Sequence, residues 1–210
     1  TGTDNTAIGD NALGANTTAS YNTAVGSGAL LVNTTGAQNT AIGQGSMGDT
    51  TTGSYNVAVG LSALTSNTTG AHNTALGKGA LDSNTTASYN TAVGSNAMDV
   101  NSTGASNTSV GYAALNANTT ASNNVAIGRS ALAANTTAGD NTAVGYQALT
   151  SNTTGDVNTA VGYKALYTNV DGDRSTAVGS QALYTQDPAS NVDMYNTAVG
   201  YAAGFYLTTG

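Results

Sequence analysis

Hydrophobic and polar positions recur along this chain with a period of seventeen residues. The repeat is N-T-A-V-G-x-x-A-L-x-x-N-T-T-G-x-x, and we number its positions 1 to 17. Position 4 is Val, Ile or Leu and position 5 is Gly in all twelve copies, whereas position 9 is Leu or Met in eleven of them. The helical period is not seen, so the pattern predicts strands and turns. The copies begin at residues 5, 22, 39, 56, 73, 90, 107, 124, 141, 158, 175 and 196.

Each repeat contains two short apolar stretches, followed by Gly and by Asn-Thr-Thr-Gly, which indicates two strands and two turns. One unit cannot bury its apolar side chains alone, so identical units are expected to stack in register. The sequence therefore predicts an all-β fold, a parallel β-solenoid (β-roll) of about twelve 17-residue coils. At about 4.8 Å per coil the rod would be roughly 55–60 Å long.

Residues 1–210 form a single repeat array, and the spacing before the last copy predicts an insertion loop within 186–195. The array begins and ends at nearly the same phase of the repeat, so we expect it to be a segment of a longer protein. The recurrence of Tyr21, Tyr55 and Tyr89 in alternate copies leaves open whether each coil holds one repeat or two.

Residues two apart on a strand share a face, so positions 2 and 4 are expected to point the same way. We assign that face to the interior, together with position 9. Position 3 then points outward and stays small, either because another sheet or chain packs closely there or because a tight coil is crowded. The predicted core ladder is Val25, Ile42, Val59, Leu76, Val93, Leu30, Leu64 and Leu81, and the predicted close-packing column is Ala24, Ala41, Ala58 and Ala75.

The turns carry most of the candidate chemistry. Asn at position 12 is expected to close the second turn and to hydrogen-bond to its equivalent in the neighbouring coil. The same turns contain Asn-x-Ser/Thr, which is either a glycosylation acceptor or simply the turn that fits. Asp171 and Asp173 in a variant turn are a weak calcium candidate. The candidate glycosylation sites are Asn16, Asn33, Asn67, Asn84, Asn101, Asn107, Asn118, Asn135 and Asn152.

Tyrosines at position 6 predict a stripe in the C-terminal half that stacks on sugar rings, on a partner chain or between coils. The stripe comprises Tyr112, Tyr146, Tyr163 and Tyr201. His72 is the only histidine and is expected to be an exposed substitution at position 17. Because one histidine and scattered aspartates assemble no catalytic set, we predict no enzymatic activity and no cofactor.

Composition narrows the classes of partner. The 210 residues include 27 Gly, no Cys and only 7% charged residues, with a net charge of −7. Four cations argue against binding of nucleic acid or of an anionic membrane surface. No apolar run is long enough to insert in a bilayer, and the absence of Cys excludes disulfides and thiol chemistry.

The strings "NTAVGYQALTSNTTG" (141–155) and "NTAIGDNALGANTTASYNTAVG" (5–26) resemble the repeat arrays of tail-fibre-like proteins. "NVAVG" (56–60) and "NVAIG" (124–128) resemble the head repeat of trimeric autotransporter adhesins. This resemblance implies a left-handed parallel β-roll in a three-chain assembly, with an extracellular location on a cell surface or a virion.

We therefore expect a structural, extracellular fibre or adhesin shaft that self-associates as a trimer or head to tail. The alternative is a solenoid surface that binds cell-surface carbohydrate or ice. The ice hypothesis needs a row of threonines on a flat outer face, and it is disfavoured here because position 2 is assigned to the interior.

Overall fold

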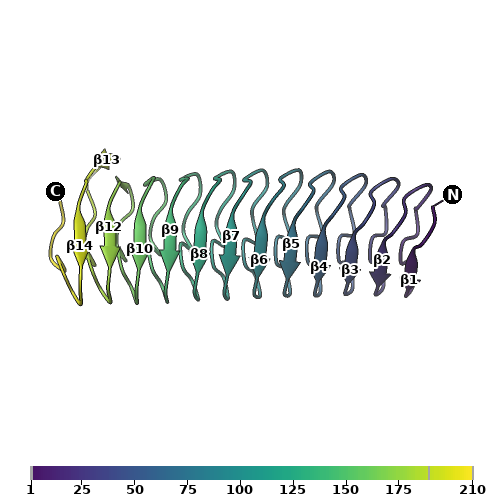
Figure 1. Cartoon of the computed structure of the whole chain (residues 1–210), viewed down its shortest axis with the longest axis horizontal. Coiled ribbons are helices and arrows are strands. Elements are labelled where there is room, and N and C mark those ends of the chain that lie inside the picture. The colour runs from purple at the N-terminus through teal and green to yellow at the C-terminus, as the bar shows by residue number, and fades with distance from the viewer. Residues whose placement is uncertain (1, 189, 210) are drawn as a thin grey trace.

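The computed structural model describes residues 2–188 and 190–209. Within these residues the chain is all-β, contains no helix and forms a parallel β-solenoid. The coils stack along a straight rod with the two termini at opposite ends (Figure 1). The predicted fold class is confirmed, and each coil holds one repeat.

Each copy of the repeat contributes one three-residue strand from positions 2 to 4, and these strands form a twelve-stranded parallel sheet in sequence order. A second, two-stranded sheet pairs β11 with β13 near the C-terminal end. The large sheet comprises β1 Thr6–Ile8, β2 Thr23–Val25, β3 Thr40–Ile42, β4 Val57–Val59, β5 Thr74–Leu76, β6 Thr91–Val93, β7 Thr108–Val110, β8 Val125–Ile127, β9 Thr142–Val144, β10 Thr159–Val161, β12 Thr176–Val178 and β14 Thr197–Val199.

The strands pair in the register that the repeat predicts. Thr23 lies beside Thr40 and Ala24 beside Ala41, so equivalent positions meet across every pairing. Between β12 and β14 the offset rises to twenty-one residues, and the extra residues lie in the loop that contains β13 (Val192–Asp193). This strand pairs with β11 (Gly172–Asp173) and projects from the coil stack (Figure 1).

Hydrogen bonds between coils continue beyond the strands. The Leu30 N–H donates to Ser46 O at 3.1 Å, and the Thr34 N–H donates to Thr51 O at 3.0 Å. The second apolar stretch is nevertheless a turn, so the prediction of two strands per repeat is wrong. At position 9 the backbone is left-handed, with φ between 49° and 56° from Leu13 to Leu183, which interrupts the extended run.

The core is built from Ala at positions 3 and 8 and Leu or Met at position 9, nearly all fully buried. The prediction of an interior position 9 is confirmed for Leu30, Leu64 and Leu81, each 0% exposed. The assignment of the two strand faces is wrong. Ala24, Ala41, Ala58 and Ala75 are completely buried, whereas Val25, Ile42, Val59, Leu76 and Val93 face outward, with Ile42 40% exposed.

The reason for the inverted faces is the narrow cross-section of the coil. A Cβ placed on Gly204, at position 9 of the last copy, would lie 3.8 Å from the Ala198 Cβ at position 3 of the same copy. Positions 3 and 9 therefore face each other, and a leucine on one side leaves room for only a methyl group on the other. Positions 2 and 4 do share a face, as predicted, but it is the outer one.

Glycine at position 5 forms the corner that follows each strand of the large sheet. Gly94 has φ of +135°, and a Cβ there would lie 2.5 Å from the carbonyl oxygen of Gly111 in the next coil. Any side chain at this position would push neighbouring coils apart. At position 7, by contrast, Gly28 has φ of +68° and open space around its missing Cβ.

We predict that Gly94→Ala lowers the free energy of unfolding by at least about 3 kcal/mol, because it adds backbone strain and a clash with the next coil. The matched control is Gly28→Asn, which places a residue that tolerates positive φ at an unobstructed position and should change the stability by less than about 1 kcal/mol. Chemical denaturation of both variants tests this. Equal stability of Gly94→Ala and the wild type would contradict the corner model.

Candidate functional site

The candidate glycosylation asparagines lie mostly inside the coil. Seven of them, at position 12, and Asn107, at position 1, are at most 1% exposed, while Asn16 in the first coil is part-buried. In Asn84 the amide nitrogen that would carry a sugar donates to Ala87 O at 3.1 Å and to Asn67 Oδ1 at 3.0 Å. The folded chain thus makes these nitrogens inaccessible. The fully buried position-12 sites are Asn33, Asn67, Asn84, Asn101, Asn118, Asn135 and Asn152.

The position-12 asparagines instead form the inter-coil hydrogen-bond ladder predicted from the sequence, which runs from Asn67 to Asn169. A second ladder, which sequence reasoning missed, runs along position 1. There Asn39 Oδ1 accepts from the Asn56 backbone N–H at 2.9 Å, while Asn56 Nδ2 donates to Gly70 O at 2.9 Å. The recurrence of Asn at position 1 was the available signal for this second ladder.

Two substitutions near the C-terminal end compensate each other within these ladders. Ser175 replaces Asn at position 1 and Gln186 replaces Asn at position 12. The longer Gln186 side chain donates to Ser175 Oγ at 2.8 Å and to Asn169 Oδ1 at 3.2 Å. Both ladders therefore remain connected.

Thr50 has no such compensation. It replaces Asn at position 12, and both its buried hydroxyl and the buried Asn33 Oδ1 lack a hydrogen-bond partner in the described chain. In intact coils the equivalent oxygen accepts from the asparagine of the next coil, as Asn67 Oδ1 does from Asn84. Asn16 Oδ1 at the N-terminal end of the row is unpaired as well, because Asn33 Nδ2 donates to Gly36 O and not to Asn16. Among the described residues the Asn-to-Asn contacts of this row are therefore continuous only from Asn67 to Asn169.

The calcium candidate is not supported by the geometry. Asp171 accepts from Thr154 Oγ1 at 2.6 Å, and Asp173 accepts from the Asp156 N–H at 2.7 Å. Burial is the main cause that raises the pKa of Asp173, against the opposing effect of that N–H. Across the described residues no three acidic, histidine or cysteine side chains gather as they would around a metal ion.

The outer face of the large sheet is the main exposed apolar surface. We use "outer face" for the side chains of positions 2 and 4 on its twelve strands. None of these residues is charged, and each threonine at position 2 has only its strand neighbours beside it in the large sheet. Five of the twelve position-4 side chains are exposed, among them Ile42 at 40% and Ile127 at 39%, and the other seven are valines that are partly exposed.

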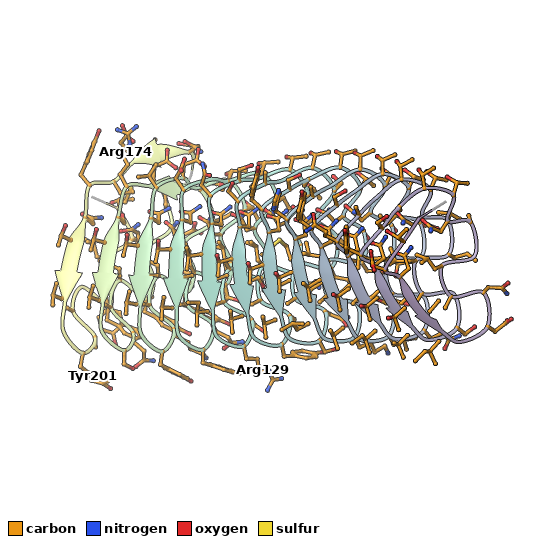
Figure 2. The ribbon with its side chains drawn as sticks, turned by 45° about the vertical axis from the view of Figure 1, so that its right-hand side comes forward. Arg129, Arg174 and Tyr201 are labelled. Carbon is orange, nitrogen blue, oxygen red and sulfur yellow. The ribbon has the colours of Figure 1, made fainter. Side chains whose placement is uncertain are left out.

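Aromatic side chains border the outer face along both edges. At position 17, His72 stacks between Tyr55 and Tyr89 with ring centroids 4.8 and 5.1 Å away. At position 6 the four predicted tyrosines are exposed, but only Tyr146 and Tyr163 stack, at 5.6 Å, because other residues occupy position 6 between the remaining members. Figure 2 shows Arg129 and Tyr201 of position 6 at one edge and Arg174 of position 17 at the other.

A further aromatic stack was not expected. Tyr184 lies between Tyr167 and Phe205 at position 10, with ring centroids 5.0 and 4.8 Å away. In-register stacking explains it, because any two aromatic residues at one position of consecutive copies must meet. The Lys164 ammonium lies 4.8 Å from the centre of the Tyr167 ring.

No pocket is found among the described residues, and they contain no helix that is long and apolar enough to cross a membrane. The candidate surface features are therefore the rows of side chains on the outer face and the aromatic stacks along its edges. No family model, curated protein or solved structure matches this chain. The assignment of function rests on the geometry of these rows.

We predict that Thr50→Asn raises the free energy of unfolding by about 1–3 kcal/mol, because it gives the buried Asn33 Oδ1 a donor and removes the unpaired hydroxyl. The reciprocal variant Asn84→Thr creates the same defect in an intact part of the ladder and should lower the stability by a similar amount. Denaturant titration of the pair tests this. Changes of the same sign in both variants would contradict the prediction.

Proposed function

We propose that this chain is a structural segment of an extracellular fibre, an adhesin or tail-fibre-like shaft that holds its two ends at a fixed separation. The continuous inter-coil hydrogen-bond ladder supports this proposal most directly. It joins each coil to the next at many points around its circumference, so tension along the rod is shared among several bonds at every step.

The surface chemistry also supports a shaft. The described residues offer no pocket for a small molecule, and the aspartates are distributed over turns, where Asp156, Asp171, Asp173 and Asp187 accept hydrogen bonds from the preceding coil. The proposal assigns the chain no catalytic activity and no cofactor. It includes self-association, because fibre shafts gain stiffness when rods bind side by side.

Ice binding is a second candidate. From the sequence it is disfavoured because position 2 is assigned to the interior, but the threonines of position 2 face outward. These threonines lie in one row on the large sheet, which Val57 and Val125 interrupt, with a spacing of about 4.8 Å from coil to coil. Carbohydrate binding has a weaker basis, the exposed tyrosines at position 6, since these rings also stack on one another within the chain.

We predict that deletion of residues 56–89, two complete copies, shortens the particle by about 10 Å and leaves it folded, because every remaining coil still meets its equivalent. The control deletion of residues 56–80 removes one copy and half of another, so it misaligns the following coils and should unfold or destabilise them. The maximum dimension from small-angle scattering and the melting curve test both variants.

The shaft proposal also predicts that the isolated chain binds no immobilised glycan. Specific binding on a glycan array that is abolished by Tyr146→Ala with Tyr163→Ala would favour a binding module instead. An unchanged particle length after the two-copy deletion would contradict the proposal that copy number sets the separation of the ends.

A further inference from the structure

The outer face is large enough to form a stable protein interface. Its twelve strands extend over roughly 50 Å, and the three residues of each strand span about 10 Å, so the strands alone cover on the order of 500 Å². With the side chains that border the outer face at positions 17 and 6, the width is about 20 Å and the area is on the order of 1,000 Å². A standard interface buries about 800 Å² on each partner. The face is also continuous, because every coil contributes the same two outward positions.

The distribution of charged residues allows a second negatively charged chain to approach the outer face without strong repulsion. The net charge is −7, and none of the eleven aspartates occupies positions 1 to 5. Two copies that approach through the outer face therefore keep their acidic residues at the edges and on the far sides. The tyrosines along the edges are residues that protein interfaces favour.

The spacing of the face favours a second copy of this chain, whose coils repeat with the same period over the same length. Position 4 forms a ridge of aliphatic side chains, position 2 forms a row of threonines, and position 3 points inward between them. The resulting pattern repeats with the coil spacing over the length of the sheet. A partner must match this spacing over about 50 Å to stay in contact, and a copy of this chain does so by construction.

The same rows of side chains match the surface of an ice crystal less well than they match a second copy. The threonine row is interrupted by Val57 and Val125, and position 4 alternates among Val, Ile and Leu, with Ile42 and Leu76 among neighbours that are valines. The ridge is therefore uneven at the scale of a methyl group. Side chains of a protein partner can repack around such differences, whereas a rigid lattice cannot.

We propose that the outer face is the surface through which a second copy of this chain packs, so that two or more rods lie side by side with their large sheets in contact. This inference rests on the proposed shaft function and assigns its self-association to named positions. The driving force is burial of the position-4 ridge, with the threonine methyl groups contributing and the aromatic edges closing the border.

The test compares two double variants of the full chain with the same change in charge. Val93→Lys with Val110→Lys places cations on the ridge of β6 and β7, while Thr103→Lys with Thr120→Lys places them on exposed turn positions of the same two copies. In sedimentation equilibrium, the wild type and the turn variant should show at least twice the 20.5 kDa chain mass. The ridge variant should show the mass of one chain.

Circular dichroism must show that the ridge variant remains folded. If the lysines unfold it, Val93→Thr with Val110→Thr preserves the shape of the side chains and should weaken association by roughly tenfold. A monomeric wild type at high concentration would overturn the inference, as would a ridge variant that stays assembled or a turn variant that dissociates equally.

A monomeric wild type that also produces thermal hysteresis would identify ice as the ligand of the outer face. Each of these results leaves the shaft proposal testable, because the two-copy deletion is assessed from the length of the rod and not from its mass. Loss of the length dependence with retained assembly would contradict the shaft and not the interface.

Discussion

The backbone hydrogen-bond ladder, which holds neighbouring coils in register so that equivalent positions stack, is the constraint on which the rest of the structure depends. Once equivalent positions are about 4.8 Å apart, every residue must be compatible with a copy of itself as a neighbour. Gly stacks on Gly at the corner, and Asn donates to Asn in the two polar rows.

The same constraint explains the low content of charged residues. Asp82 and Asp99 occupy position 10 of consecutive copies, and the pKa of Asp99 is raised first by partial burial and then by the charge of Asp82. A charged residue repeated in all copies would accumulate such repulsion along the rod. Amides, hydroxyls and aromatic rings cause no such repulsion, because two neighbouring groups of the same type attract each other through hydrogen bonds or stacking. The stack of Tyr55, His72 and Tyr89 is an example.

The sequence was sufficient to predict how the copies stack but not which side of each strand faces inward. The period and the shared face of positions 2 and 4 follow from local chemistry, which is also true of the asparagine ladder at position 12. The assignment of the inner face failed because burial usually selects the larger aliphatic residues. Here the interior is too narrow for two of them, and the restriction of position 3 to Ala and Ser109 was the sign of that limit.

Other features could not be predicted because they depend on the closed coil as a whole. The left-handed conformation of Leu30 and its equivalents is unfavourable for an isolated leucine. It is maintained because the turn places the side chain in the core and lets its N–H donate to the next coil. The pairing of Ser175 with Gln186 likewise requires that positions 1 and 12 meet across the interior.

The narrow interior also links the fold to the proposed assembly. Because the core accepts only two methyl groups and one leucine or methionine per coil, a single rod buries little apolar surface for its length. Its cohesion along the axis comes mainly from hydrogen bonds, and the aliphatic side chains that recur in every copy outside the core are those of position 4 on the outer face. Packing copies through this face would add the hydrophobic burial that one coil cannot provide, so that axial and lateral cohesion arise from different residues of the same repeat.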